Sequence, residues 1–519
     1  MTDQLQAPQT GASAHHVAAP RRARGARAVA RHASDRGEGF GRFVGLTALG
    51  AILPGVGLLV AGRRKAGAAV LLVIAAFVAA AGYLLITGQA KSFGINTAVD
   101  PQRLLILAVV FAVGGLLWCA VIIATAIAAK THRLSGVQRA LGVVLVAALC
   151  LTVAMPSAAA ARYSLITRDL IDSVFADSPV KPIPGVVQPK AEAADPWANV
   201  GRVNMLLIGS DAGADRTGLR TDSLIVASID TKTGNTVLFG LPRNLENVPF
   251  PPNDPLSKVW PNGFNCGSVC LLNAVWQQGE QHKNLFPGDK QPGLTATRDV
   301  VGAVLGLQVD YYTIIDLAGF QGLVNAMGGV YVNVDKKLPI GGSHDANGHV
   351  LTNPTGYITP GRHKKLTGYQ ALWFARSRFS SDDYDRMRRQ RCMVSALVDQ
   401  SNPVKLLQKY PKIASVAKHN IETDIPRKDL PAWVTLVERM QGGKITSLPF
   451  TSSVVNTTHP DFDRIHALVK KALRAATAGG DASTVTATGT ATAGAGGTTA
   501  TKPSGSGSTS PSQNVDEVC

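Results

Sequence analysis

Four long apolar blocks stand near the start of the chain, and a longer region of short alternating patterns follows them. The blocks cover about residues 43–62, 66–87, 104–129 and 141–161. Each has about the 20 residues that a helix needs to cross the hydrocarbon core of a bilayer, and none carries a charged side chain. The pattern therefore predicts a membrane region at residues 43–161. The arginine-bearing residues 1–42 contain no apolar run, and we expect a disordered cytoplasmic tail there.

Positive charges between the blocks predict the orientation of the membrane region. Arg63, Arg64 and Lys65 separate the first two blocks, and Lys130, Arg133 and Arg139 separate the last two. Short loops this basic remain in the cytoplasm, so the chain after Arg162 is expected outside the membrane. The predicted location is therefore the cell membrane, with several membrane passes and an extracytoplasmic domain.

The first apolar block is interrupted by Leu53-Pro54-Gly55. Proline breaks a helix and glycine permits a sharp turn, so this block is predicted to be a re-entrant or interfacial hairpin followed by three spans. The alternative is four spans with the residue 1–42 tail outside the cell.

Beyond the membrane region, strand-like and helix-like patterns alternate. Residues 162–199 are predicted to form a juxtamembrane helix and a linker, and residues 200–475 a single folded domain. Ala, Thr, Gly and Ser dominate residues 476–519, which cannot bury a core and are expected to be a disordered tail. Strands are predicted at 203–208, 223–229, 236–241, 311–315, 330–334 and 445–448, and helices at 301–307 (its end), 317–327, 368–374, 385–400, 403–417 and 430–441. This alternation favours a sheet covered by helices on both faces.

Composition agrees with a membrane part joined to a water-facing part. The chain has 519 residues and a formal net charge of +17, yet its mean hydropathy is slightly positive. Residues 162–474 hold 36 Lys and Arg against 28 Asp and Glu. These values exclude a disulfide-stapled mini-protein and a wholly disordered chain. Cys266 and Cys270 are close enough to pair in an oxidising compartment, and no nearby His or Cys completes a metal site with them.

Two groups of charged residues are candidates for chemistry. Asp211 follows one predicted strand, Asp222 begins the next, and Arg243 follows the third. Two carboxylates at neighbouring strand ends suit a divalent ion such as Mg²⁺ together with phosphate oxygens. The alternative for these aspartates is a turn and capping role.

The second group contains six arginines within residues 376–391. If residues 385–400 form a helix, Arg386, Arg389 and Gln390 share one face, and an apolar face lies elsewhere on the helix. Guanidinium groups suit phosphate or diphosphate recognition, although a solvated basic face would have the same composition. Nucleic acid is not expected as the partner, because the domain is predicted to lie outside the cytoplasm.

These residues, taken in order, resemble the LytR–CpsA–Psr family. The likeness covers about residues 203–401 and rests on an ordered set of short matches: Asn204–Asp211, Arg220-Thr221-Asp222, Leu241-Pro242-Arg243, Leu272-Asn273-Ala274, Gly328-Gly329-Val330, Leu366–Leu372, Ala375–Arg378, Asp383–Arg386 and Arg389-Gln390. The resemblance implies a three-layer α/β/α sandwich with a deep apolar pocket for a lipid tail.

The resemblance also implies an activity. Family members are membrane-anchored phosphotransferases that take a glycopolymer from a polyprenyl-diphosphate carrier and attach it to peptidoglycan through a phosphodiester bond. It implies Mg²⁺ held by Asp211 and Asp222. The residues expected to bind the diphosphate are Arg220, Arg243, Arg376, Arg378, Arg386, Arg389 and Gln390. Those expected to take part in catalysis are Arg243, Asp383, Arg386 and Arg389, with Asp383 as an acid/base or arginine-orienting group.

Two positions depart from the family pattern. Asn244 stands where members usually carry aspartate, and Asp385 stands where glycine is usual and is expected to pair with a neighbouring arginine. Two other functions stay open from sequence. One is a non-catalytic protein that binds wall glycopolymer or acts as a membrane sensor or regulator, and the other is a hydrolase that releases glycan from polyprenyl diphosphate.

Overall fold

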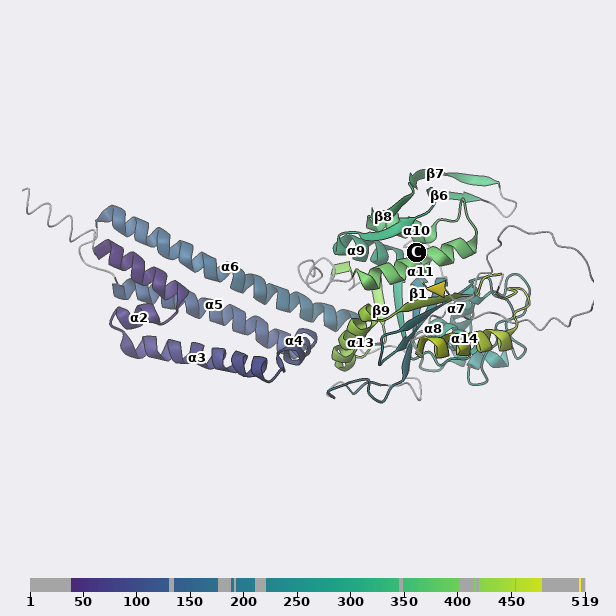
Figure 1. Cartoon of the computed structure of the whole chain (residues 1–519), viewed down its shortest axis with the longest axis horizontal. Helices are drawn as coiled ribbons and strands as arrows, with labels where there is room; N and C mark the ends of the chain where they lie inside the picture. Colours follow the sequence, from purple (N-terminus) through teal and green to yellow (C-terminus); the bar gives the residue numbers. More distant parts are fainter. Residues whose placement is uncertain are drawn as a thin grey trace, which may run out of the picture. The chain divides into compact units, whose positions relative to one another are not determined.

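The structure is a computed structural model that describes residues 39–129, 135–175, 188–190, 193–210, 221–344, 349–400, 415–416, 420–452, 454–477, 513–514 and 519 (Figure 1). The chain divides into two compact units. The first comprises Met1–Ala90 and Ala108–Ala161, and the second comprises Lys91–Leu107 and Arg162–Cys519.

Three helices among the described residues are long and apolar enough to cross a membrane. They are α3 (Arg64–Ile86), α5 (Pro101–Ala129) and α6 (Gly136–Val174), and they correspond to the second, third and fourth apolar blocks. Helix α6 continues past the apolar block, so the predicted juxtamembrane helix is the end of the same helix, with Pro156 inside it. A short helix that the sequence pattern did not predict, α4 (Ala90–Val99), lies between α3 and α5 in the chain.

The first apolar block is broken where the sequence predicted a break. A helix at Gly39–Ile52 ends before Leu53, and α2 (Val56–Val60) is too short to span a bilayer. Gly55 adopts a left-handed conformation with φ of 98°, which disfavours a residue with a side chain. A Cβ atom on Gly55 would lie 2.8 Å from the Gly67 carbonyl oxygen. The turn therefore depends on glycine both for its backbone conformation and for its close approach to α3.

The second unit is built on a seven-stranded mixed sheet. Its strands follow the order β11 (Gln513–Asn514), β10 (Ile445–Pro449), β3 (Thr236–Leu241), β2 (Thr221–Asp230), β1 (Arg202–Ser210), β4 (Tyr311–Asp316) and β9 (Ile421–Thr423). Strand β1 is antiparallel to β2 and parallel to β4. The five strands predicted at β1, β2, β3, β4 and β10 are confirmed to within two residues, whereas β9 and β11 were not predicted.

Alternating side chains of the central strands enter two different cores. Leu206 and Ile208 of β1 pack with helices α7 (Val275–Gln281), α8 (Pro292–Leu305) and α14 (Phe462–Thr477), whereas Val203 packs in the core of α13 (Leu430–Gly442). This period of two is what a sheet with both faces buried requires. Short 3-10 helices occupy Pro255–Lys258, Leu272–Ala274, Lys283–Leu285 and Arg427–Asp429. The predicted helix at 403–417 lies outside the described residues, apart from 415 and 416.

A third apolar cluster joins three helices to two small sheets. Helices α9 (Leu317–Met327), α10 (Gly368–Arg376) and α11 (Asp383–Asp399) were all predicted, and they share this cluster through Val324, Phe374 and Met393. Strand β5 (Val330–Val334) was also predicted, but it pairs with β8 (Gly361–Leu366) outside the main sheet, and β6 (Leu338–His344) pairs with β7 (Val350–Ile358). Figure 1 shows β6, β7 and β8 beside α10 and α11.

Local hydrogen bonds fix where these helices begin. The Asp316 carboxylate accepts from the Gly319 amide and caps α9, and Thr367 forms a capping box with Gln370 at the start of α10. The Asp382 carboxylate accepts from the Asp385 amide and caps α11. The helix that carries most of the clustered arginines therefore begins at a defined residue, directly after the α10–α11 loop.

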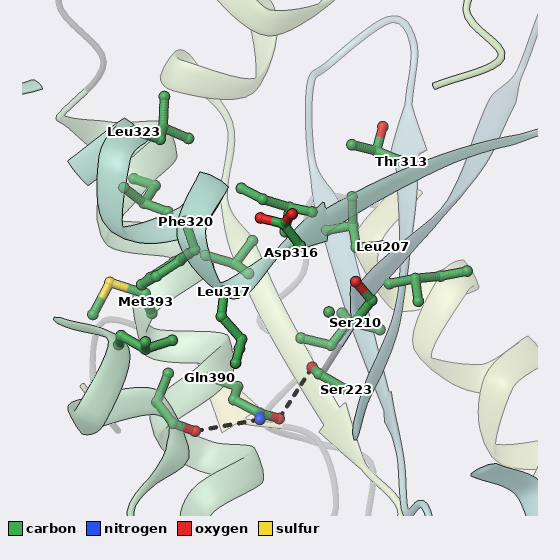
Figure 2. Close-up of a pocket in the computed structure, with 18 of the residues that line it drawn as sticks. Leu207, Ser210, Ser223, Thr313, Asp316, Leu317, Phe320, Leu323, Gln390 and Met393 are labelled. Carbon is green, nitrogen blue, oxygen red and sulfur yellow. Dashed lines mark hydrogen bonds between the residues drawn. The ribbon is translucent and has the colours of Figure 1, made fainter. Parts of the chain in front are cut away.

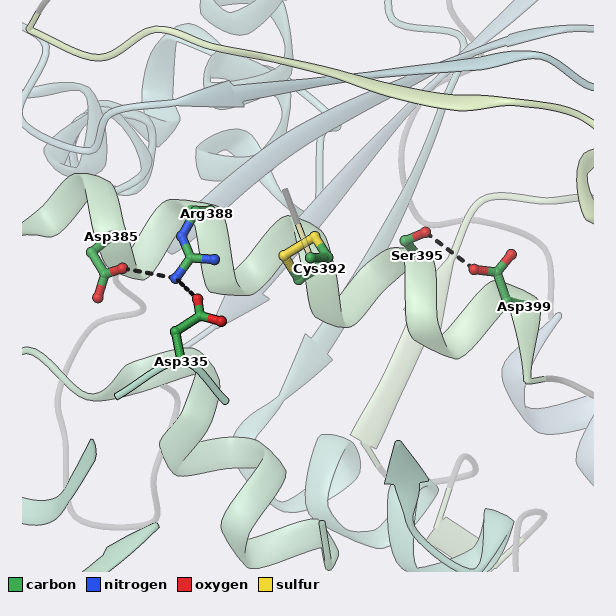
Figure 3. Close-up of a disulfide and its surroundings, with 7 residues drawn as sticks. Asp335, Asp385, Arg388, Cys392, Ser395 and Asp399 are labelled. Carbon is green, nitrogen blue, oxygen red and sulfur yellow. Dashed lines mark hydrogen bonds and ion pairs between the residues drawn. A yellow bond between two sulfur atoms is a disulfide. The ribbon is translucent and has the colours of Figure 1, made fainter. Parts of the chain in front are cut away.

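Two disulfides join cysteines of the second unit. The predicted Cys266–Cys270 bridge is present, and a second bridge, not predicted, joins Cys392 of α11 to Cys519 (Figure 3). The second bridge closes a separation of 127 residues. Cross-linking so long a segment removes more conformational entropy from the unfolded chain than a bridge between near neighbours.

We predict that Cys519→Ser destabilises the protein more than Cys266→Ser, because the two bridges close loops of very different length. The loop-entropy relation gives about 5 kcal/mol for the long loop and about 2 kcal/mol for the short one. Thermal unfolding of the full chain in detergent, without reductant, measures both effects. An equal loss of stability in the two variants would contradict the prediction.

Candidate active site

An apolar pocket lies between the main sheet and helices α9, α10 and α11. Its volume is about 280 Å³, and its walls come from Leu207, Ile208, Gly209 and Ser210 of β1, Ser223 and Ile225 of β2, Thr313, Ile315 and Asp316 of β4, Leu317, Phe320 and Leu323 of α9, Leu372, Ala375 and Arg376 of α10, and Gln390, Met393, Val394, Leu397 and Val398 of α11 (Figure 2). Most of these side chains are aliphatic or aromatic, so the pocket suits a hydrocarbon ligand.

The few polar groups of the pocket wall include a small hydrogen-bonded set around Gln390. The Ser223 hydroxyl donates to Gln390 Oε1 at 3.2 Å, and Gln390 Nε2 donates to the Ala375 carbonyl oxygen at 3.3 Å (Figure 2). Arg376, the last residue of α10, lines the same pocket. Gln390 stands one helical turn after Arg386, so the polar part of the pocket adjoins the arginine-rich end of α11.

Three arginines surround the Asp383 carboxylate at the start of α11. Arg386 Nη2 lies 3.0 Å from Asp383 Oδ1, Arg243 Nε lies 3.6 Å from it, and Arg378 Nη1 lies 3.7 Å from it. The arginines come from three segments: the turn after β3, the α10–α11 loop, and α11 itself. Three guanidinium groups and one carboxylate leave two net positive charges, so this cluster can attract a phosphate or diphosphate.

The arginines of this cluster differ in exposure. The Arg386 side chain is only 4% exposed, whereas Arg243 and Arg378 are 30% and 45% exposed. Arg386 is therefore the buried partner of the Asp383 carboxylate. Arg243 and Arg378 reach solvent, where a ligand can approach them.

Arg389, for which the resemblance implies diphosphate binding and catalysis, is buried. Its side chain is 2% exposed, and its guanidinium donates to the carbonyl oxygens of Phe374 and Ser377 and, at 3.2 Å, to the Ser381 hydroxyl. All three partners lie at the end of α10 or in the α10–α11 loop. Arg389 therefore ties the end of α10, which carries Arg376, to the loop that carries Arg378.

Asp385 pairs with neighbouring cations, as predicted. Its carboxylate lies 3.1 Å from Lys336 Nζ, 3.2 Å from Arg388 Nη2 and 3.3 Å from Arg389 Nε. Burial would raise the pKa of Asp385, but the charges of Arg389 and Lys336 and the hydrogen bonds outweigh it and hold its pKa below the ordinary value. Burial lowers the pKa of the Arg389 guanidinium, and Asp385 opposes that shift.

The structure does not describe the side chains of several predicted site residues. Asp211 and Arg220 lie outside the described residues, and only the backbone of Asp222 is described, in β2. Asn244 is exposed in the turn beside Arg243. Among the residues that the structure describes, no three His, Cys, Asp or Glu side chains gather as a metal site.

Sequence reasoning assigned no role to Asp316 and Ser223 of the pocket. Both stand at a strand end on the edge of the sheet that carries the pocket, Asp316 as the last residue of β4 and Ser223 near the start of β2. That position, a polar residue at the end of an apolar strand, is the signal that could have identified them.

Residues 177–472 match the model of the LytR_cpsA_psr family. Since the match covers more than half of the chain, the protein belongs to this family. It is similar to the polyisoprenyl-teichoic acid–peptidoglycan teichoic acid transferase TagV of Bacillus subtilis (strain 168), with 27% identity over 45% of this chain and 52% of TagV. It is also similar to biofilm regulatory protein A of Streptococcus mutans serotype c, with 29% identity over 43% of this chain and 50% of that protein.

The match spans about half the length of these two relatives. Among solved structures, the crystal structure of Bacillus subtilis TagV aligns with 25% identity and a TM-score of 0.38, over 53% of this chain and 96% of TagV as solved.

We predict that Asp385→Asn lowers the stability of the protein at neutral pH, because Arg389 loses its buried ionic partner. Charge-assisted hydrogen bonds of this kind contribute about 1.5–3 kcal/mol. The folded-state pKa of Asp385 lies below the unfolded value, so its contribution is fully present above about pH 4 and is lost as the pH falls through the folded-state pKa.

The measurement is the melting temperature of both proteins, as full chains in detergent, between pH 3 and pH 7. The two values should differ by several degrees at pH 7, and the difference should shrink as the pH falls below about 4. A difference that is constant across this range would refute the ionic origin of the effect.

Proposed function

We propose that the protein is a membrane-anchored phosphotransferase that attaches a glycopolymer from a polyprenyl-diphosphate carrier to peptidoglycan through a phosphodiester bond. The observation that carries this proposal is that the apolar pocket and the arginine cluster are built on the same elements, the end of α10 with the loop after it and helix α11. Arg376 lines the pocket and stands two residues before Arg378 of the cluster, and Gln390 stands four residues after Arg386. A prenyl diphosphate has an apolar chain and an anionic head, so its binding site needs an apolar surface next to a basic one.

The arrangement suggests what each group does. The prenyl chain would enter the apolar pocket, and the diphosphate would meet Arg243, Arg376 and Arg378. A hydroxyl of the wall glycan attacks the sugar-side phosphorus, the bond from that phosphorus to the bridging oxygen breaks, and polyprenyl phosphate leaves with the hydroxyl proton. The guanidinium groups would neutralise the charge that grows on the leaving phosphate, so catalysis consists mainly of positioning and electrostatic stabilisation.

Asp383 is proposed to orient arginines in this scheme. Its ion pairs with Arg243, Arg378 and Arg386 support this role over that of a general base. Arg386 and Gln390 would hold the diphosphate end from the side of α11, and Arg389 would act through the loop rather than on the ligand. Arg220 stays a proposed diphosphate ligand from the resemblance alone.

Mg²⁺ is proposed as the metal, with Asp211 and Asp222 as its protein ligands. Ser210, the last residue of β1, pairs with Thr221, the first residue of the antiparallel strand β2. Each aspartate is next in sequence to one of these two residues, so both adjoin, in sequence, the same end of the sheet. Two carboxylates and phosphate oxygens form the donor set that Mg²⁺ prefers. When bound, the ion would neutralise part of the diphosphate charge.

The location and the scaffold are also proposals. The basic loops favour an extracytoplasmic domain, and the two disulfides of the second unit suit an oxidising compartment. The interrupted first block favours a hairpin followed by three membrane passes, so the protein would sit in the cell membrane among its lipid substrates. Cores on both faces of the main sheet support a three-layer α/β/α sandwich.

We predict that Arg243→Ala lowers transfer at least about 100-fold, because removing one electrostatic contact to a developing charge typically costs that much. Arg243 is part-exposed in a turn, so the variant should fold. Arg474→Ala is the matched control: Arg474 is exposed in the last turn of α14, whose Thr477 contacts Arg202 at the opposite end of β1 from the pocket, and its loss should change the rate by no more than a few-fold.

The assay uses the full chain in liposomes with a polyprenyl-diphosphate glycan, Mg²⁺ and peptidoglycan fragments. Ligated glycan that depends on Arg243 supports the transferase. Free glycan without ligation would assign a hydrolase instead, and binding without turnover would assign a glycopolymer-binding or regulatory protein. Equal transfer by wild type and Arg243→Ala would reject the proposed role of the cluster.

A further inference from the structure

The two small sheets each carry an exposed tyrosine paired with a lysine. Lys337 Nζ lies 4.1 Å from the centre of the Tyr357 ring, and Lys365 Nζ lies 5.8 Å from the centre of the Tyr331 ring. Tyr357 is 48% exposed and Tyr331 is 37% exposed. Both pairs therefore combine a part-exposed tyrosine with a positive charge, and the Tyr331 ring also stacks on the His363 ring at a centroid distance of 4.6 Å.

The Lys337–Tyr357 pair lies beside the arginine-bearing loop. Tyr357 of β7 is the register partner of Pro339 of β6, and the Pro339 carbonyl oxygen accepts a hydrogen bond from the Ser377 hydroxyl at 2.8 Å. Ser377 stands between Arg376 and Arg378 in the sequence. Two contacts thus link the exposed pair to the residues proposed to bind diphosphate.

The segment before β6 is also fastened to the start of α11. Lys336, next to Lys337, lies 3.1 Å from Asp385, and Asp335 lies 2.9 Å from Arg388 (Figure 3). These ion pairs fix the end of the β6–β7 hairpin at the arginine-rich end of α11.

The Lys365–Tyr331 pair lies near the C-terminal end of α11. The Tyr331 amide donates to the side chain of Gln400, the residue that follows α11. Since α11 has 17 residues, its two ends are about 25 Å apart. The second unit therefore contains two lysine–tyrosine pairs, one near the proposed diphosphate site and one, whose ring also stacks on His363, far from it.

The charge of this region favours an anionic ligand. Across the described residues 330–344 and 349–366, five lysines and arginines stand against a single acid, Asp335. An exposed aromatic ring can stack on the C–H face of a sugar, and an ammonium group beside it can bind a phosphate or carboxylate on that sugar. Together these groups suit a charged glycan.

We propose that Lys337 and Tyr357 form a subsite for the anionic glycan of the lipid-linked donor. This inference rests on the proposed function. In the donor the glycan is covalently joined to the diphosphate, so a diphosphate bound at the arginine cluster holds the first sugars of the glycan nearby. That tether favours the donor over the peptidoglycan acceptor and over membrane phospholipid as the occupant.

The test compares two double variants of the full chain in detergent, Lys337→Gln with Tyr357→Ala and, as the matched control, Lys365→Gln with Tyr331→Ala. Binding is measured for farnesyl diphosphate, for farnesyl diphosphate bearing a phosphate-substituted tetrasaccharide, and for peptidoglycan fragments. The first variant should bind the glycan-bearing donor about 10- to 100-fold more weakly than wild type. Its affinity for farnesyl diphosphate, which also reports correct folding, should be unchanged, and the control should match wild type throughout.

Several results would overturn the proposal. They are equal losses in the two variants, a loss of farnesyl diphosphate binding in the first variant, weakened binding of peptidoglycan fragments instead of donor, or no added affinity from the tetrasaccharide in wild type. Failure of wild type to bind farnesyl diphosphate at all would reject the proposed function itself, so the two failures are distinguishable.

Discussion

The buried guanidinium of Arg389 is the interaction on which the site depends. A charged side chain removed from water is costly unless its donors are satisfied, and Arg389 satisfies them on Phe374, Ser377, Ser381 and Asp385. These partners are the end of α10, the α10–α11 loop and the first turn of α11. Because one side chain joins all three, Arg376 at the end of α10 and Arg378 in the loop are tied to the arginines of α11.

Helix α11 contributes to both the apolar pocket and the charged cluster. Its middle and C-terminal part contributes Met393, Val394 and Leu397 to the apolar pocket, and its first turns contribute Asp383 and Arg386 to the charged cluster. Water and salt screen the interactions of charged groups that are fully exposed. The charged groups of this cluster are partly buried next to an apolar cavity, so they interact more strongly. Cys392 stands between these two regions of α11. Its disulfide with Cys519 joins the helix to a part of the chain that is distant in sequence.

Much of this architecture was predictable from sequence because it follows a period. Apolar residues are regularly spaced in strands β1 to β4 and β10 and in helices α9 to α11, and these helices also have clear N-caps. The pairing of Asp385 with an arginine follows from the spacing of the two residues along a helix. Strand β7 was missed because its outer residues, such as Val350 and Tyr357, are exposed and show no apolar alternation. The environment of Arg389 and the Cys392–Cys519 bridge depend on contacts between residues distant in space or sequence, which no local pattern encodes.

The most direct test of an apolar pocket and a charged cluster that act as one site is the affinity of the full chain, in detergent, for farnesyl diphosphate, farnesol and inorganic diphosphate. If one site receives both the prenyl chain and the diphosphate, farnesyl diphosphate should bind at least about 100-fold more tightly than either fragment, since each contributes several kcal/mol. Farnesol binding as tightly as farnesyl diphosphate would contradict a shared site, because the arginine cluster would then add nothing to the affinity of the lipid.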